Sequence, residues 1–517
     1  MGARGAAQAY ECTRGAALQP LPLGYHRRQP EKGILHKVVR ENLESFLAEL
    51  REDGRDLPRF VEQELRRFLL CGMLSEGFVR CVCRSCGDEL LVAFSCKGRG
   101  FCPSCCARRM SDTAAHLVDR VLPLIAYRQW VLAYPRRLRL AFAHHPRAAA
   151  ESATIFLREV FRAQRKQARR EGGKSPRVGA VCFTHRFGSR LDLNVHHHAL
   201  LPDGVFTLGD DGVVGFVKLE RPTIEGLERV LGRIVVKTLA MVRRRGLLDE
   251  EPPDALASVQ AEALQTALPL GDLPRDDSRK LAVFLEGFSL QAGTHVHERD
   301  REGLEHLLRY ALRPPLSVDR LSRAPDGKVL LSLRRPLSDG IQAVAFKPTQ
   351  FLKRLAAIVP PPRVHSTRYF GVFAPRSHVR ALLVPKSPKR RPRSCESPPN
   401  SSPQCLNHES LTFALRDELG FDPLALGPPP MPLRPRRLDW ASLLQRVFAL
   451  DVLQCPCGAR RRVTAFIPSG RLACQILARL GIDATGPPLA PARARPRQEY
   501  FDLHPEDPGV DPQYPDS

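Results

Sequence analysis

Three consecutive histidines lie in residues 191–206, LDLNVHHHALLPDGVF, a segment typical of a β-strand that ends at a Pro-Asp-Gly turn. Side chains alternate between the two faces of a strand, so we expect His196 and His198 on one face and His197 on the other. Two imidazoles on the same face of a strand form part of a site for a divalent cation. The pair does not close such a site by itself, and a half-buried histidine run without a metal is the alternative.

The length and charge of the chain restrict its architecture and its partners. With 517 residues, 43% of them hydrophobic, the chain is too long for a single core, and we expect roughly two to four domains. The excess of 79 Lys and Arg over 55 Asp and Glu gives a net charge of +24. Such an excess favours a polyanionic partner, nucleic acid above a membrane surface.

The sequence also indicates a compartment and excludes some cofactors. No apolar run reaches the length of a transmembrane helix, and the first residues lack the apolar stretch of a signal peptide. We therefore expect a cytoplasmic protein without a membrane partner. Fifteen cysteines in a reducing compartment favour metal binding or buried thiols over disulfides. The sequence has no GxxxxGK[ST] motif, so no role for ATP is expected.

Two CxxC pairs lie close together in the N-terminal part of the chain. Cys83 and Cys86 form the first pair, Cys102 and Cys105 form the second, and fifteen residues separate the pairs. Cysteine pairs on two tight turns at this spacing are typical of a structural site with one tetrahedral Zn²⁺. We predict that these four thiolates bind one zinc ion, and that Cys96 is a spare or buried thiol.

Residues 301–316, REGLEHLLRYALRPPL, are typical of a helix that ends at Pro314. Tyr310 lies off the apolar stripe of this helix, on the same face as Arg313, so its hydroxyl is expected to be accessible. An accessible tyrosine without a role is the alternative. The stripe at helical spacing consists of Leu304, Leu307, Leu308, Ala311 and Leu312.

The order of the helix and strand patterns indicates the fold class. Strands joined by short turns mix with helices, which favours an α+β fold over a parallel one. We expect an antiparallel sheet flanked by helices, with an N-terminal cysteine zinc module and a small C-terminal module. The expected divisions are a flexible arm at 1–33, helices and the zinc module at 34–122, the main domain at 123–385, a Pro/Ser/Arg-rich linker at 386–437, the small module at 438–485 and a disordered tail at 486–517.

Several segments, taken in order, resemble the rolling-circle insertion-sequence transposases of the IS91 type. These belong to the histidine–hydrophobe–histidine (HUH) superfamily of single-strand DNA nucleases. The resemblance runs from about residue 70 to 385 and resumes at 438–480. It implies an HUH-type catalytic domain at 123–385 behind an N-terminal zinc-binding domain. The segments that carry it are FSCKGRGFCPSC with ARRM, RQWVLAYP, RFGSRLDLNVHHHALLPDGVF, GFSLQA, LLRYALRPPL and RYFGVFAP.

The resemblance also implies the residues of a catalytic site. The motif histidines correspond to His196 and His198, which would hold Mg²⁺ or Mn²⁺ against the scissile phosphate. Gln291 stands where the family often has histidine and is the implied third ligand, through its carbonyl oxygen. The family tyrosine corresponds to Tyr310, whose phenolate would form a 5′-phosphotyrosine link and leave a free 3′-hydroxyl. Pro314 stands one helical turn on, where related enzymes have a second tyrosine, so single-tyrosine chemistry is implied.

The sequence departs from the family pattern in its details. His197 stands where the family has a hydrophobe, and Gln291 replaces a histidine. The C-terminal turn, Cys455-Pro-Cys457-Gly, is one residue shorter than the CxxC of the family, which leaves open whether it binds zinc.

The resemblance predicts a transposase, an enzyme that cleaves and rejoins single-stranded DNA at transposon ends. It would act in the bacterial cytoplasm, on the nucleoid. Arg108, Arg109 and Arg313 are candidate contacts to DNA phosphates, and a solvated basic face is the alternative for the first two. Two other functions are retained: a replication initiator or relaxase with the same chemistry, and a catalytically inactive zinc-dependent DNA-binding relic. The oligomeric state is not indicated.

Overall fold

The computed structural model describes two stretches of the chain. They are residues 28–383, apart from 55, 210–211, 248–254, 266–280, 334–335 and 337–339, and residues 438–493, apart from 449–450 and 484–485. The predicted arm up to residue 27, the predicted linker at 386–437 and the predicted tail beyond residue 493 lie outside the described residues.

Seven strands of the described chain form one antiparallel sheet, with the histidine strand β5 (Leu193–Pro202) inside it. β5 pairs with β4 (Gly179–Phe187) on one side and with β3 (Tyr127–Ala133) on the other. A turn in which the N–H of Gly188 donates to the carbonyl of Asp192 makes β4 and β5 a hairpin. The sheet confirms the predicted antiparallel α+β fold. Its other strands are β14 (Thr367–Gly371), β9 (Phe288–Gln291), β8 (Ala282–Leu285) and β10 (His295–Val296), in the order β14-β4-β5-β3-β9-β8 with β10 beside β3.

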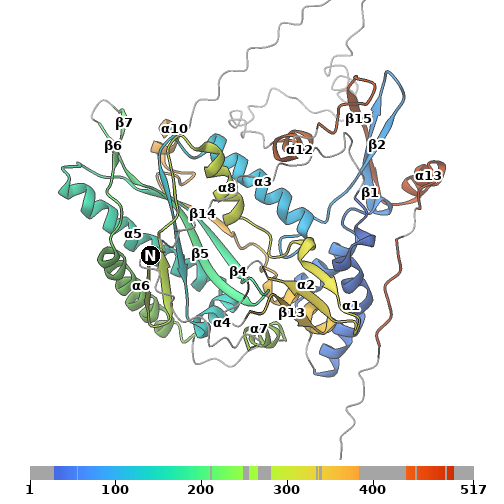
Figure 1. The fold of residues 1–517 in the computed structure, drawn as a ribbon, viewed down its shortest axis with the longest axis horizontal. Helices are drawn as coiled ribbons and strands as arrows, with labels where there is room; N and C mark the ends of the chain where they lie inside the picture. Colours follow the sequence, from blue (N-terminus) through green and yellow to red (C-terminus); the bar gives the residue numbers. More distant parts are fainter. Residues whose placement is uncertain are drawn as a thin grey trace, which may run out of the picture.

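Helices cover both faces of this sheet (Figure 1). Because side chains alternate along β5, Val195 and Ala199 enter a large core on one face, and Leu200 enters a second core on the other. The helices over the first face are α4 (Arg136–His144), α5 (Pro146–Arg170), α6 (Ile224–Arg244), α7 (Ala255–Gln265) and α9 (Pro348–Ile358). The helices over the second face are α3 (Pro103–Arg120) and α8 (Arg301–Ala311).

The predicted tyrosine helix is α8. Its N-cap is Asp300, whose carboxylate accepts a hydrogen bond from the backbone N–H of Gly303 at 2.7 Å. Leu304 and Leu308 are buried against α3 and the sheet, as the predicted apolar stripe requires. The helix ends shortly before Pro314, which cannot continue it.

The two ends of the described chain meet in a smaller antiparallel sheet. Its strands β1 (Gly77–Cys83) and β2 (Glu89–Ala93) form a hairpin after α1 (Ile34–Glu52) and α2 (Arg59–Leu69). β15 (Arg461–Pro468) lies along the other edge of β1, between α12 (Trp440–Phe448) and α13 (Arg471–Arg479) in sequence (Figure 1). The predicted C-terminal module is therefore part of the N-terminal sheet, and its strand was not predicted.

Shorter elements complete the described chain. The elements are η1 (Pro30–Lys32), η2 (Leu74–Glu76), β6 (Gly204–Leu208), β7 (Val214–Lys218), η3 (Val318–Arg320), β11 (Leu321–Arg323), β12 (Val329–Ser332), β13 (Ala343–Phe346) and α10 (His378–Leu383).

No helix among the described residues is long and apolar enough to cross a membrane.

Candidate functional site

Three imidazoles converge on the face of the central sheet that α3 and α8 cover. His196 and His198 project from β5, and His185 projects beside them from β4, because the hairpin register pairs His185 with His196. One ring nitrogen from each histidine lies within 4.8 Å of the other two. The rings are buried, and their centroids are 4.5 to 5.1 Å apart. This histidine cluster is a candidate metal site.

Two ring nitrogens in the cluster are buried and have no hydrogen-bond partner among the described residues. Nε2 of His185 donates to the carbonyl of Ala311 at 2.5 Å, which leaves its Nδ1 unpaired. Nδ1 of His198 faces the side-chain amide of Gln129 at 3.1 Å, which leaves its Nε2 unpaired. Burial lowers the pKa of His185 to about 3 and that of His196 to about 4, so both rings are neutral at pH 7. Neutral, oriented imidazoles with free nitrogens fit a divalent transition-metal ion.

His197 lies on the opposite face of β5, as the strand alternation predicts. It is fully buried, and its ring nitrogens lie 3.2 Å from Oγ of Ser152 and 3.0 Å from Oγ1 of Thr184. Its ring also meets the edge of Tyr134, with 5.5 Å between centroids. The histidine that replaces the hydrophobe of the family is therefore a hydrogen-bonded core residue.

Gln291, the predicted third ligand, lies in the same row of the sheet as His198, because both pair with Val131 of β3. It lies on β9, which β3 separates from β5, so its backbone is about 10 Å from that of His198 at two strand spacings. Its side chain is exposed. Gln291 therefore stays a prediction as a ligand, and the structure adds a third imidazole, His185, from the strand adjacent to β5. The turn at Gly188 was the signal in the sequence, since a hairpin there brings His185 opposite His196.

Tyr310 is accessible, as predicted. Its side chain is 48% exposed, and the guanidinium of Arg313 lies 4.4 Å from the centre of its ring. The next residue, Ala311, accepts the hydrogen bond from His185. The last turn of α8 is thereby attached to the histidine cluster, with the tyrosine at its exposed side.

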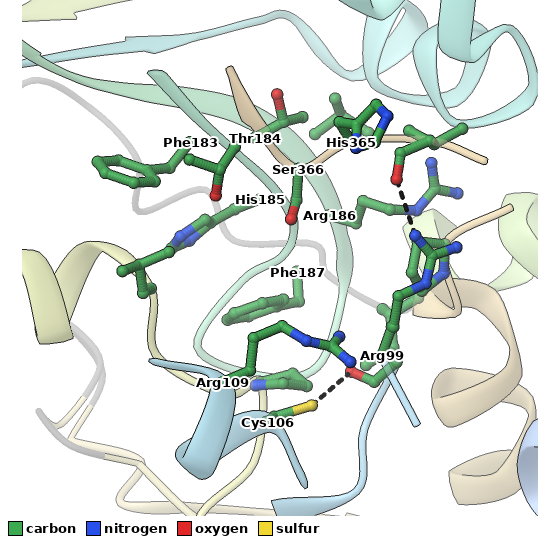
Figure 2. Close-up of a pocket in the computed structure, with 18 of the residues that line it drawn as sticks. Arg99, Cys106, Arg109, Phe183, Thr184, His185, Arg186, Phe187, His365 and Ser366 are labelled. Atoms are coloured by element: carbon green, nitrogen blue, oxygen red, sulfur yellow. Dashed lines mark hydrogen bonds between the residues drawn. The ribbon is translucent and has the colours of Figure 1, made fainter. Parts of the chain in front are cut away.

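A basic pocket of about 160 Å³ adjoins the histidine cluster (Figure 2). His185 lines it, and no carboxylate does so among the described residues. It includes two of the three arginines predicted to contact DNA, while Arg108 is exposed on α3 and is not part of its lining. The arginines of the pocket are Arg99, Arg109, Arg186, Arg313 and Arg368.

Arg186 shows what kind of ligand suits this pocket. Its terminal nitrogens donate to the carbonyl of Ala143 at 3.2 Å, and its Nε is buried without a partner among the described residues. Burial lowers the pKa of this guanidinium to about 10. A half-buried guanidinium with an unpaired Nε and no carboxylate in the pocket lining among the described residues favours binding of an anion such as a phosphate.

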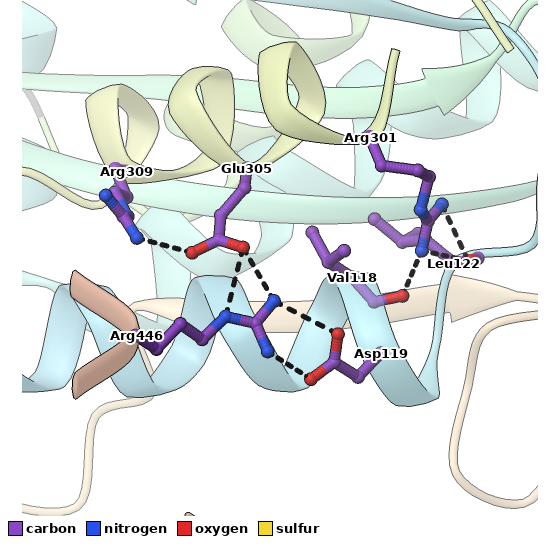
Figure 3. Close-up of polar contacts among 7 residues, drawn as sticks. All are labelled: Val118, Asp119, Leu122, Arg301, Glu305, Arg309 and Arg446. Atoms are coloured by element: carbon purple, nitrogen blue, oxygen red, sulfur yellow. Dashed lines mark hydrogen bonds and ion pairs between the residues drawn. The ribbon is translucent and has the colours of Figure 1, made fainter. Parts of the chain in front are cut away.

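The C-terminal segment connects the tyrosine helix to α3 through one arginine (Figure 3). The guanidinium of Arg446 on α12 contacts Asp119 of α3 at 2.5 Å and Glu305 of α8 at 2.6 Å. Glu305 also pairs with Arg309 of its own helix. Although burial raises the pKa of Glu305, these two arginines outweigh that effect and hold the pKa below its usual value.

Cysteines form two clusters in the part of the chain that the structure describes. In each cluster four sulfur atoms lie within 4.8 Å of one another. The inner cluster consists of Cys71, Cys96, Cys102 and Cys105, and the outer cluster of Cys83, Cys86, Cys455 and Cys457.

The inner cluster lies at the N-terminus of α3. Sγ of Cys71 is 3.6 Å from that of Cys102 and 3.7 Å from that of Cys105, and Sγ of Cys96 is 3.5 Å from that of Cys105. These separations resemble the edge of about 3.8 Å in a tetrahedron with Zn–S bonds of about 2.3 Å. The N–H groups of Cys96 and Gly98 donate to the sulfurs of Cys71 and Cys96, which favours thiolates.

The predicted single site of Cys83, Cys86, Cys102 and Cys105 is wrong in its pairing. The first pair lies at the tip of the β1–β2 hairpin, and the second lies at its base with Cys71. β1 is seven residues long, so the tip is about 20 Å from the base. No single ion can bind both pairs. Reading FVRCVC and ELLVA as a hairpin would have revealed this separation.

The comparisons with known families agree with this geometry. Residues 179–380 match the family model Y2_Tnp, described as “Putative transposase”. Residues 38–134 match Zn_Tnp_IS91, the transposase zinc-binding domain. The chain belongs to the IS91-type transposases. No curated protein and no solved structure matches the transposase.

The two matched segments contain different sites of the transposase. The first covers the three histidines and Tyr310, and the second covers the whole inner cysteine cluster. The zinc-binding domain and its cysteines support structural Zn²⁺ in the transposase. As a member of this family the protein processes DNA.

Proposed function

We propose that the transposase cleaves and rejoins single-stranded DNA at transposon ends, with Tyr310 as the nucleophile, in a rolling-circle reaction. The observation that carries the proposal is the meeting of three imidazoles, two of them with an unpaired ring nitrogen, at the end of the helix that exposes Tyr310. The proposal takes its reaction class from the HUH resemblance and its residues from this arrangement.

The proposed reaction consists of two balanced transfers. The phenolic oxygen of Tyr310 gives up its proton and attacks phosphorus, and the bond from phosphorus to the 3′ oxygen breaks. The leaving oxygen takes a proton and becomes a 3′-hydroxyl, while the 5′-phosphate stays on the tyrosine. In rejoining, a 3′-hydroxyl attacks the same phosphorus and releases the tyrosine. The number of phosphoester bonds is conserved, so the cycle needs no ATP.

A divalent cation would be held by His185, His196 and His198. When bound, it would polarise a non-bridging phosphate oxygen and offset the charge that develops in the transition state. Three nitrogen donors suit Mn²⁺ better than Mg²⁺, which prefers oxygen ligands. The hydrogen bonds from His185 to Ala311 and between His198 and Gln129 would orient the rings for this role.

The basic pocket is the proposed path of the DNA strand next to the scissile phosphate. Arg186 and Arg313 line it together with His185, and no carboxylate among the described residues lines it to neutralise their positive charges. Arg313 also lies over the ring of Tyr310, so it can hold a phosphate near the nucleophile. Arg109 would contact the strand from the zinc-binding domain.

The test is formation of a covalent adduct. The protein is incubated with Mn²⁺ and single-stranded DNA that carries the ends of its own element and a label on the 3′ side, and is then denatured. We expect a labelled protein band that Tyr310→Phe abolishes without loss of DNA binding. Tyr369→Phe is the matched control, since this tyrosine of β14 also has an arginine, Arg380, over its ring.

Three outcomes would contradict the proposal. An adduct that survives Tyr310→Phe would exclude this nucleophile. DNA binding without any adduct, with either Mn²⁺ or Mg²⁺, would identify an inactive DNA-binding protein. Adducts formed equally well on an unrelated replication origin would favour an initiator or relaxase over end-specific transposition.

A further inference from the structure

The outer cysteine cluster joins segments that are more than 350 residues apart in sequence. Sγ of Cys83 lies 3.6 Å from that of Cys457, and Sγ of Cys86 lies 3.5 Å from that of Cys455. The first pair belongs to the tip of the β1–β2 hairpin, and the second to the turn before β15. The family zinc-binding domain ends at residue 134 and so contains only half of this cluster.

The geometry of the outer cluster is that of a tetrahedral thiolate site. All four sulfurs lie within 4.8 Å of one another, and the four cysteines are free. The sulfur separations of 3.6 and 3.5 Å between the two pairs are close to the tetrahedral edge of about 3.8 Å for zinc and far from a disulfide bond of about 2.05 Å. Two short turns, each with a glycine in the left-handed region at Gly87 (φ 76°) and Gly458 (φ 85°), present the pairs to one point.

The packing of β15 indicates why a cross-link is needed there. β15 pairs with β1 along its whole length, but of its eight residues only Ile467 is buried. The core beneath this sheet is small, with six buried side chains among the described residues. Arg461 and Asp88 form an ion pair beside these cysteines. An ion pair near the protein surface contributes little to stability.

We propose that Cys83, Cys86, Cys455 and Cys457 bind a second structural Zn²⁺, which fastens the C-terminal segment to the zinc-binding domain. The CPCG turn, one residue shorter than a CxxC, completes this site. The site has a consequence for the tyrosine helix, because the fastened segment also carries Arg446, which contacts Glu305 on α8 (Figure 3). Loss of the second zinc should therefore loosen α8 as well as β15.

The test is a zinc count on the full chain. A mercurial thiol reagent should release two zinc ions per wild-type molecule, since it attacks thiolate sites and leaves imidazole sites intact. The double variant Cys455→Ser, Cys457→Ser should release one. Cys474→Ser is the matched control, because this exposed cysteine of α13 lies outside both clusters, and it should release two.

A second measurement separates zinc loss from misfolding. Hydrogen exchange of the double variant should speed up in β15 and α12, and then in α8, while α1 and α2 remain protected as in the wild type. Release of a single zinc from the wild-type chain would overturn the proposal, as would release of two from the double variant. Uniformly fast exchange would assign the cysteines to general folding and would also overturn it.

Discussion

Replacing His185 by glutamine should weaken metal binding without detaching the tyrosine helix. In the structure Nε2 of His185 donates to the carbonyl of Ala311, and Nδ1 is the free nitrogen in the cluster. The amide nitrogen of glutamine stands near the position of Nε2, so His185→Gln can keep the bond to Ala311. The glutamine side chain has no nitrogen lone pair at the position of the imidazole Nδ1. The variant therefore removes one ligand and retains the attachment.

The magnitude follows from the number of ligands. Removing a partner that only orients a ligand costs about 10- to 100-fold in metal affinity. Removing one of the three imidazoles should cost at least about 100-fold, or about 2.7 kcal/mol at 1.36 kcal/mol per tenfold change. The retained hydrogen bond to Ala311 contributes about 1 kcal/mol to stability, so the melting temperature should change little.

The assay is a Mn²⁺ titration followed by electron paramagnetic resonance of the free ion, with the rate of adduct formation measured in parallel. His185→Gln should need at least about 100-fold more Mn²⁺ for half-saturation in both measurements. Gln291→Ala is the control and should leave both unchanged, because Gln291 lies two strands from His198. Unchanged Mn²⁺ binding in His185→Gln, or equal weakening in Gln291→Ala, would refute the assignment of the third ligand.

Three further predictions concern the packing of the tyrosine helix, the ion pairs of Arg446 and the binding of DNA. Leu308→Ala removes a fully buried side chain between α8 and the sheet and should destabilise the protein by about 2–5 kcal/mol in thermal unfolding; no change would mean that α8 is not packed as described. Arg446→Gln should destabilise by about 1–2 kcal/mol, since Glu305 is half-buried and Asp119 is exposed. The folded-state pKa of Glu305 is lowered, so its ion pairs contribute to stability above its usual pKa of 4.5, and this contribution is lost as the pH falls through the folded-state pKa. The stability difference between wild type and Arg446→Gln should therefore shrink in acid. A difference that stays constant with pH would contradict this prediction. The logarithm of DNA affinity should fall linearly with the logarithm of salt concentration, and Arg313→Gln should reduce the slope by about one; a flat dependence would mean that phosphates do not bind here.

The sequence determined what depends on local periodicity. The strand alternation fixed His196 and His198 on one face and His197 on the other, and the apolar stripe of the helix fixed the exposure of Tyr310. These features follow from backbone geometry within one element, so they hold whatever the element packs against. The motif order was also sufficient to recognise the family and the antiparallel sheet.

Only the tertiary structure decided which residues complete each site. The third imidazole depends on the β4–β5 register, and a shift of one residue would turn His185 to the other face. The cysteine pairs are alike in sequence, but the length of the β1–β2 hairpin separates them. The partners of Cys83 and Cys86 are supplied by β15's approach to β1, a contact between residues more than 350 positions apart. The spacing of residues along the chain predicts metal ligands that lie in the same turn. Ligands on different strands depend on which strands pair and in which register, and local sequence patterns do not encode this.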